Sequence, residues 1–196
     1  MQRTILAFIT VLLFSGTAYA WPPVDTFSAT TPKNQTTVDT IQINFDSLKK
    51  DHWSAQDIQH VTLLIDFIQH LMNDHDFGYV EKQFGNNLYT QHNRNIPDGL
   101  TALIENVRGL AKRYPEYTYD VKHIYVDGDY VIFHSHATLK AKHRGNDQKG
   151  LNIIDTWRIE NGLIAEHWDA IQPLDASMRF FVWMNGGKIR NTNGVF

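Results

Sequence analysis

The chain contains no cysteine, and this absence removes several kinds of chemistry at once. Disulfide bonds, thiolate nucleophiles and cysteine metal sites are all excluded. The sequence also lacks the Gly-rich loops that bind phosphate groups and the Gly-x-Ser-x-Gly elbow of serine hydrolases. Its net charge of −3 gives no electrostatic reason to expect nucleic acid or an anionic membrane as a partner.

Long hydrophobic runs are also scarce. The apolar run from Ile5 to Phe14 follows Arg3 and precedes the small residues Ala18 and Ala20, a pattern typical of an export signal cleaved after Ala20. This run is too short to span a bilayer, and no later run reaches the ~18 apolar residues that a spanning helix needs. We therefore expect a signal peptide at residues 1–20 and an exported protein, periplasmic or secreted, with no membrane contact after cleavage.

The mature chain has the length of one domain with flanking segments. Residues 21–52 are rich in Thr, Pro and Asp and predict an N-terminal linker or arm, in which Ile41–Leu48 could form a short strand. The folded domain is expected at residues 53–173. Residues 174–196 form an apolar C-terminal extension, which could cover the core, form a strand or make an oligomer contact.

Periodicity predicts three helices followed by strands. The helices are expected from Ser54, capped with Asp57, to about Asn73, at Phe77–Phe84, and from a cap at Asp98 to near Tyr114. The expected strands are Tyr117–Val126, Tyr130–Lys142, Gly150–Glu160 and Leu163–Gln172. This order predicts an α+β fold in which helices cover one face of an antiparallel sheet.

The last two strands are expected to form a hairpin around Asn161-Gly162. We expect a three-residue turn with a Gly bulge, which would pair Asp155 with His167. A tight two-residue turn would instead pair Asp155 with Trp168 and leave His167 and Asp169 on the opposite face, because a one-residue slip flips every side chain. In the expected register, one face carries Asp155, Trp157, Ile159, Leu163, Ala165, His167 and Asp169.

Several motifs taken together resemble the SnoaL-like polyketide cyclase family of the nuclear-transport-factor-2-like superfamily. They are Tyr89-Thr90-Gln91-His92-Asn93, Asp98-Gly99, Asp129-Tyr130-Val131, His134-Ser135-His136, Ile154-Asp155-Thr156-Trp157-Arg158 and Asn161 to Asp169. The resemblance covers residues 53–173. It implies a cone-shaped α+β barrel, with three N-terminal helices packed on a curved antiparallel sheet, a pocket between them, and often a homodimer.

The named enzymes of that family close polyketide rings by aldol condensation without a metal or organic cofactor. The resemblance places their strand aspartate at Asp169 and a second pocket position at Asp155. It also places Tyr89 and Asn93 in a motif that would contact a ligand. The export signal departs from the family pattern, because polyketide cyclases work inside the cell beside their synthases.

Four residues are expected to carry the chemistry. Asp169 is the expected base, because burial of a carboxylate in an apolar pocket raises its pKa toward the working pH. His167 lies on the same face, and Asp155 could fix its tautomer. His92, in the loop after the second helix, could donate to the substrate oxygen.

Other residues are expected to contact the ligand. Trp157 would form pocket wall, and His134 and His136, which share one face of their strand, would add donors if that face lines the pocket. Alternatively, this His-x-His pair with His167, His92 or Asp155 could bind zinc or iron.

These observations predict an exported, cofactor-free lyase or isomerase acting on a small hydrophobic carbonyl compound. The main alternative is a small-ligand-binding protein without catalysis, and a His/Asp metal site is the third possibility.

Overall fold

The computed structural model describes residues 40–186 and 190–194. The predicted signal peptide and most of the predicted linker lie outside the described residues. The helices are α1 Phe45–Leu48, α2 Ala55–Ile68, α3 Phe77–Phe84, α4 Leu100–Arg113 and α5 Ala176–Asn185, and the strands are β1 Thr90–Gln91, β2 Thr118–Asp127, β3 Tyr130–Thr138, β4 Leu151–Glu160 and β5 Leu163–Pro173.

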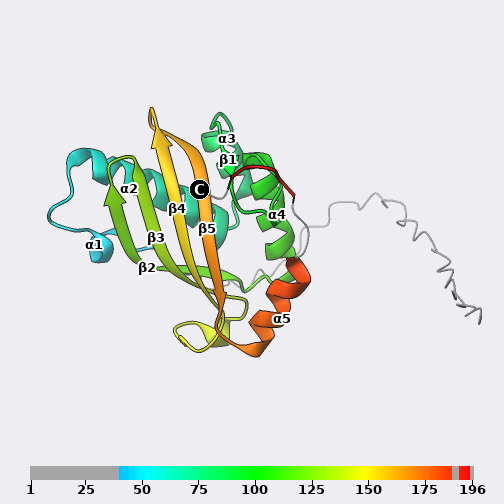
Figure 1. Ribbon diagram of the computed structural model, residues 1–196. Helices are drawn as coiled ribbons and strands as arrows, with labels where there is room; N and C mark the ends of the chain where they lie inside the picture. Colours follow the sequence, from blue (N-terminus) through cyan, green and yellow to red (C-terminus); the bar gives the residue numbers. More distant parts are fainter. Residues whose placement is uncertain (1–39, 187–189, 195–196) are drawn as a thin grey trace, which may run out of the picture. The chain divides into compact units, whose positions relative to one another are not determined.

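The fold is α+β, as predicted, and its sheet is curved but does not close into a barrel (Figure 1). Within the described residues the strand order is β1-β5-β4-β3-β2. The four long strands pair antiparallel, but the two-residue strand β1 pairs parallel with β5, so the sheet is mixed rather than purely antiparallel. This short strand brings the loop after α3 alongside β5.

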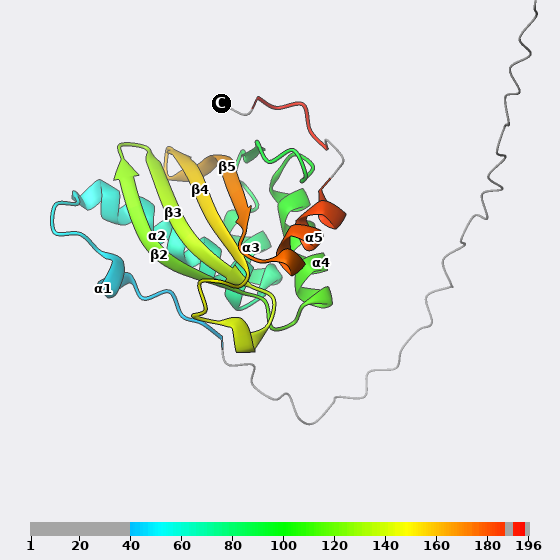
Figure 2. The same cartoon turned by 60° about the horizontal axis from the view of Figure 1, so that its bottom comes forward.

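The helices α2, α3 and α4 cover one face of the sheet (Figure 2). The capping box of Ser54 and Asp57 is present and begins α2 as predicted. The N-cap of α4 is Gly99 rather than Asp98, because the Asp98 carboxylate accepts hydrogen bonds from the backbone N–H groups of Gln91 and Gly99. Residues 45–48 form the short helix α1 instead of a strand.

The core lies between these helices and the inner face of the sheet. Val61, Leu64 and Phe67 of α2 are completely buried, and the Phe67 ring meets the edge of Trp157 with centroids 5.6 Å apart. Burial of each such large side chain contributes about 1.5–3 kcal/mol. This packing fixes the inner face of β4, from which Asp155 also projects into the cavity.

The end of α2 widens into a π-helical turn, Gln69–Asn73. The Asn73 amide donates to the carbonyl of Tyr119 (3.0 Å) and accepts from its N–H (2.8 Å), so the turn is tied to β2. Such turns occur frequently at functional sites, and here Leu71 and Met72 of the turn line a cavity.

The β4–β5 hairpin corrects the expected register. The turn is the tight two-residue form at Asn161-Gly162, in which both residues have positive φ. A bulge at Ala165 then adds a residue to β5, so that Asp155 pairs with Asp169 and Trp157 with His167. The three-residue turn and the pairing of Asp155 with His167 were therefore wrong. The shared face of Asp155, His167 and Asp169 is nevertheless present, because the bulge restores the alternation.

The two-residue turn also exchanges the faces of two residues next to it. Leu163 was expected on the inner face but is 41% exposed, whereas Ile164 was expected outside and is buried.

The C-terminal extension forms α5, whose Phe181 and Val182 pack against the core, while Phe180, Trp183 and Met184 remain exposed. Among the described residues, no helix is long and apolar enough to cross a membrane.

Candidate functional site

A cavity of about 410 Å³ lies between the inner face of the sheet and the helices. Its walls are largely apolar and include Ile68, Leu71, Met72, Leu103, Val107, Leu151, Ile153, Trp157 and Val182. A group of polar residues, Asn93, Asp155, His167 and Asp169, also lines it. An apolar cavity with a few convergent polar groups is the usual form of a small-molecule site.

Asp155 and His167 form a buried pair on neighbouring strands. The Nε2 atom of His167 lies 2.9 Å from Oδ1 of Asp155, and the two residues are 3% and 5% exposed. The Trp157 ring stacks on the imidazole, with centroids 3.9 Å apart and planes inclined by 20°. This stacking holds the imidazole flat against the cavity wall.

The completely buried Gln91 sets the tautomer of His167. The backbone N–H of Asn93 donates to Oε1 of Gln91 (2.9 Å), and Nε2 of Gln91 donates to the Tyr89 hydroxyl (2.9 Å), so both ends of this amide are assigned. Nδ1 of His167 lies 3.2 Å from the same Oε1, which can only accept. His167 therefore carries a proton on Nδ1, and in the neutral imidazole Nε2 accepts from Asp155.

The Asp155 carboxyl is consequently the donor of the pair. Burial raises the pKa of Asp155 well above its usual range, and burial lowers the pKa of His167 to about 4. The second oxygen of Asp155 is buried and has no hydrogen-bond partner among the described residues, so nothing compensates a negative charge there. Near neutral pH, a carboxylic acid thus donates its proton to a neutral imidazole.

Asp169 stands beside this pair and is held by Asn93. The Asn93 amide nitrogen lies 2.7 and 2.6 Å from the two carboxylate oxygens of Asp169. The backbone N–H of Asn95 donates to Oδ1 of Asn93 (2.8 Å) and orients the amide. The pKa of Asp169 is raised, mainly by burial and also by Asp155, while His167 and the Asn93 amide oppose the rise. Unlike Asp155, Asp169 remains partly exposed.

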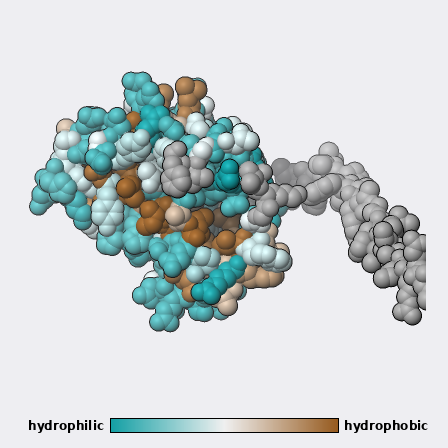
Figure 3. Space-filling view, viewed as in Figure 1, coloured by the Kyte–Doolittle hydropathy of each residue, from teal (hydrophilic) through white to brown (hydrophobic). Residues whose placement is uncertain are grey.

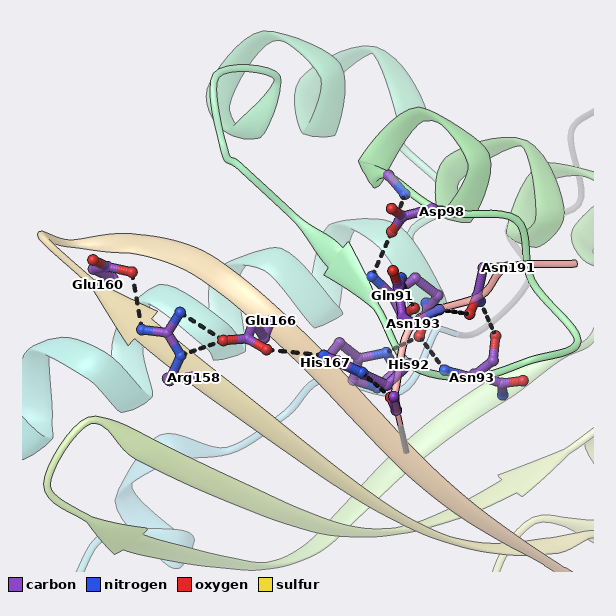
Figure 4. Close-up of polar contacts among 12 residues, drawn as sticks. Gln91, His92, Asn93, Asp98, Arg158, Glu160, Glu166, His167, Asn191 and Asn193 are labelled. Atoms are coloured by element: carbon purple, nitrogen blue, oxygen red, sulfur yellow. Dashed lines mark hydrogen bonds and ion pairs between the residues drawn. The ribbon is translucent and has the colours of Figure 1, made fainter. Parts of the chain in front are cut away.

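The segment that carries Gln91 and Asn93 is fastened by the C-terminal tail (Figure 4). Asn191 donates from its amide to the carbonyls of Asn93 and Ile96, both at 2.9 Å. The amide of Asn193 donates to the carbonyl of Gln91. The tail thereby orders the segment that positions both His167 and Asp169.

Three expected histidines lie away from the cavity. His92 stacks on Trp168, with centroids 4.3 Å apart, and its Nε2 lies 2.8 Å from Glu166, on the outer face of the sheet (Figure 4). His134 and His136 also project from the outer face, where Nε2 of His134 meets Asn152 and Nε2 of His136 meets the carbonyl of Lys149. The expected placement of all three at the pocket was wrong. The inner face of β3 carries Val131, Phe133, Ser135 and Ala137 instead of His134 and His136. His92 follows β1 and is held by Glu166 and Trp168.

The other expected residues divide. Trp157 and Asn93 line the cavity as expected, whereas Tyr89 lies behind His167 and contacts Gln91. Sequence reasoning missed Gln91 and Tyr119. The Tyr119 hydroxyl is buried without a hydrogen-bond partner among the described residues, and its ring lines the cavity. A Gln two residues before Asn93 in the same motif was the available signal for the first.

A metal ion has limited support from these side chains. One ligand atom each of Asp155, His167 and Asp169 lies within 4.8 Å of the others, a spacing that would suit an ion. However, Asp155 and His167 already share a hydrogen bond, and Asn93 occupies both oxygens of Asp169. The alternative set that relied on His134, His136 and His92 is not assembled.

The described residues thus combine a curved sheet, helices over one of its faces and a cavity between them. Residues 64–167 match the SnoaL-like domain family, and the chain belongs to this family.

Solved structures of similar fold have low sequence identity to this chain. A proposed polyketide cyclase from Bacillus cereus is 16% identical to this chain. The match covers 63% of this chain and 81% of the cyclase, with a TM-score of 0.50. A nuclear-transport-factor-2-like protein of unknown function from Cytophaga hutchinsonii is 15% identical, with coverages of 64% and 96% and a TM-score of 0.43. No curated protein matches the chain.

Proposed function

We propose that the chain is a cofactor-free lyase or isomerase that removes a proton next to the carbonyl of a small hydrophobic compound. The observation that carries this proposal is Asp169, a partly exposed carboxylate with a raised pKa in a largely apolar cavity. A base of this kind is effective when its pKa lies near the working pH. The adjacent Asp155–His167 pair is neutral overall and does not neutralise the base by a full ion pair.

An enolate formed in this cavity needs a hydrogen-bond donor for its oxygen. The O–H of Asp155 is committed to His167, and the amide of Asn93 to Asp169. Tyr119 lines the cavity, and its buried hydroxyl has no partner among residues 40–186 and 190–194, so this hydroxyl is the donor that we assign to the enolate oxygen. In this scheme Asp169 takes the carbon-bound proton and returns it to another position of the substrate.

The second candidate function is ligand binding without turnover. It is favoured by the hydrogen bonds from the Asn93 amide to both oxygens of Asp169. At least one of these bonds must break before Asp169 can accept a proton as a base.

Deuterium exchange distinguishes the two functions. Methyl 4-oxodecanoate serves as a hydrophobic ketone, and mass spectrometry follows exchange of the protons beside its ketone in D₂O. We expect Asp169→Asn to lower the enzymatic exchange rate about 100-fold or more, and Tyr119→Phe to lower it about tenfold. Glu160→Gln, at the exposed tip of the same hairpin, is the control and should exchange like the wild type.

Exchange no faster than in buffer, combined with binding of the ketone, would favour the second candidate function. Wild-type rates in Asp169→Asn would show that another group is the base.

Two further parts of the proposal concern the whole protein. Export rests on residues 1–20 and predicts that the protein recovered from the producing cells begins at Trp21.

Assembly as a homodimer would use the outer face of the sheet, where hydrophobic side chains lie across the middle of Figure 3. Tyr125 and Tyr130 on this face are 55% and 42% exposed. Light scattering on purified protein would give twice the mass of the chain.

A further inference from the structure

The exposed residues around the cavity define its mouth. They come from the loop after β1, from α4, from β5 and from the C-terminal segment. The polar ones are Asn95, Glu105, Asn106, Arg113, Asn185 and Arg190, and the others are Gly109 and Ile171. The mouth is therefore mostly polar, in contrast to the largely apolar walls of the cavity.

The charges at the mouth are predominantly positive. Nε of Arg108 lies 3.2 Å from Oε1 of Glu105 and offsets the charge of the acidic residue at the mouth. Arg113 donates to the neutral amide oxygen of Asn185, at 3.3 Å. Neither Arg113 nor Arg190 forms an ion pair with a carboxylate in the part of the chain that the structure describes. Two guanidinium groups without an acidic partner thus border the cavity of a chain whose net charge is −3.

The polar group on the sheet excludes an anion. Asp169 is an acid itself, and His167, which could offset another negative charge, is neutral near pH 7 because burial lowers its pKa to about 4. Among the described lining residues, the only Lys or Arg side chains are those of Arg113 and Arg190. A ligand with an acidic group can therefore be accommodated in one orientation, with the acid at the mouth.

We propose that the ligand is an amphiphilic oxo acid, whose carboxylate binds Arg113 and Arg190 while its apolar body fills the cavity and its carbonyl lies at Asp169. This inference rests on the proposed function for the role of Asp169, but the anion subsite stands on the mouth residues alone. Guanidinium groups bind carboxylates through paired, charge-assisted hydrogen bonds. The volume of about 410 Å³ is in the range that encloses a small organic molecule.

The test compares two probes with the same body, 4-oxodecanoate and its methyl ester, by isothermal titration calorimetry. The wild type should bind the acid about tenfold more tightly than the ester, and added salt should reduce the difference. The Arg113→Gln/Arg190→Gln double variant should bind both probes equally. Arg179→Gln, an exposed arginine of α5 outside the cavity lining, should keep the preference.

Equal or tighter binding of the ester by the wild type would overturn the subsite, as would an acid preference that survives in the double variant. Absence of binding of either probe would overturn it too. The deuterium exchange assay separates this result from the proposed function. If the acid binds more tightly but neither probe undergoes exchange, the anion subsite is supported and the proposed enzymatic function is contradicted. If both probes exchange at equal rates and bind equally well, the enzymatic function is supported and the anion subsite is contradicted.

Discussion

The proton shared by Asp155 and His167 should make the stability of this protein decrease as the pH rises. In the unfolded chain an Asp ionises near pH 3.9 and a His near pH 6.5. In the folded protein the pKa of Asp155 is raised and that of His167 is lowered to about 4. The contribution of Asp155 is lost as the pH rises, whereas that of His167 is lost as the pH falls from 6.5 toward 4.

Between about pH 4 and 6.5 the two effects cancel, because both the folded and the unfolded pair hold one proton. Above pH 6.5 the unfolded pair holds none and the folded pair still holds one. The free energy of unfolding should then fall by about 1.4 kcal/mol per pH unit until the raised pKa of Asp155 is reached.

Asp155→Asn removes the ionisable acid but keeps a donor to Nε2 of His167. Between pH 5.5 and 7.5 the variant should gain stability relative to the wild type, by up to about 2.7 kcal/mol, the limit set by two pH units at about 1.4 kcal/mol each. Urea unfolding at both pH values measures this difference. Asp147→Asn, in an exposed loop, is the control and should follow the wild type.

Parallel pH profiles of Asp155→Asn and wild type would refute the reasoning, because they would mean that Asp155 is ionised beside a neutral His167. The ¹⁵N chemical shifts of His167 give an independent test. They should report a neutral ring protonated on Nδ1, and an imidazolium spectrum at pH 7 would place the shared proton on His167 instead.

Four further substitutions test the surrounding structure. Gln91→Leu deprives the Asn93 N–H and Nδ1 of His167 of their acceptor, and should cost about 2–5 kcal/mol in urea unfolding and shift the His167 ring nitrogens in ¹⁵N spectra. Gly150→Ala should cost about 3 kcal/mol, since its Cβ would lie 2.2 Å from a backbone oxygen at a φ of +87°; Gly162→Ala, in open space, should cost about 1 kcal/mol. Asn191→Ala should increase amide hydrogen exchange over residues 93–96, and unchanged protection there would show that the tail does not order the segment.

The sequence predicted the helices and long strands because their signals are local. The capping box of Ser54, the helix Phe77–Phe84 and the position of the turn at Asn161-Gly162, though not its length, follow from residues near each other in the chain. The family resemblance added the inner position of Asp169, which the structure confirms by placing it in the cavity lining.

The features that sequence reasoning missed depend on contacts between distant residues. Gln91 acquires its role only when β1 pairs with β5, and this two-residue strand has too little pattern to be recognised. His134 and His136 carry no signal for the face that they occupy, since the strand β3 is partly buried on both faces. The position of α5 depends on the packing of Phe181 and Val182, which an apolar composition alone does not specify.

The bulge at Ala165 determines which of the following residues of β5 face the cavity. Because Ile164 pairs with Ile159 and Glu166 with Arg158, Ala165 is a supernumerary residue that the ladder does not count. Deletion of Ala165 would leave the pairing of β5 with β4 unchanged, and Asp169 and His167 would still point inward. Deletion of Thr156, in the neighbouring strand β4, would instead shift the pairing by one residue. Side chains that line the cavity would then move to the outer face of the sheet.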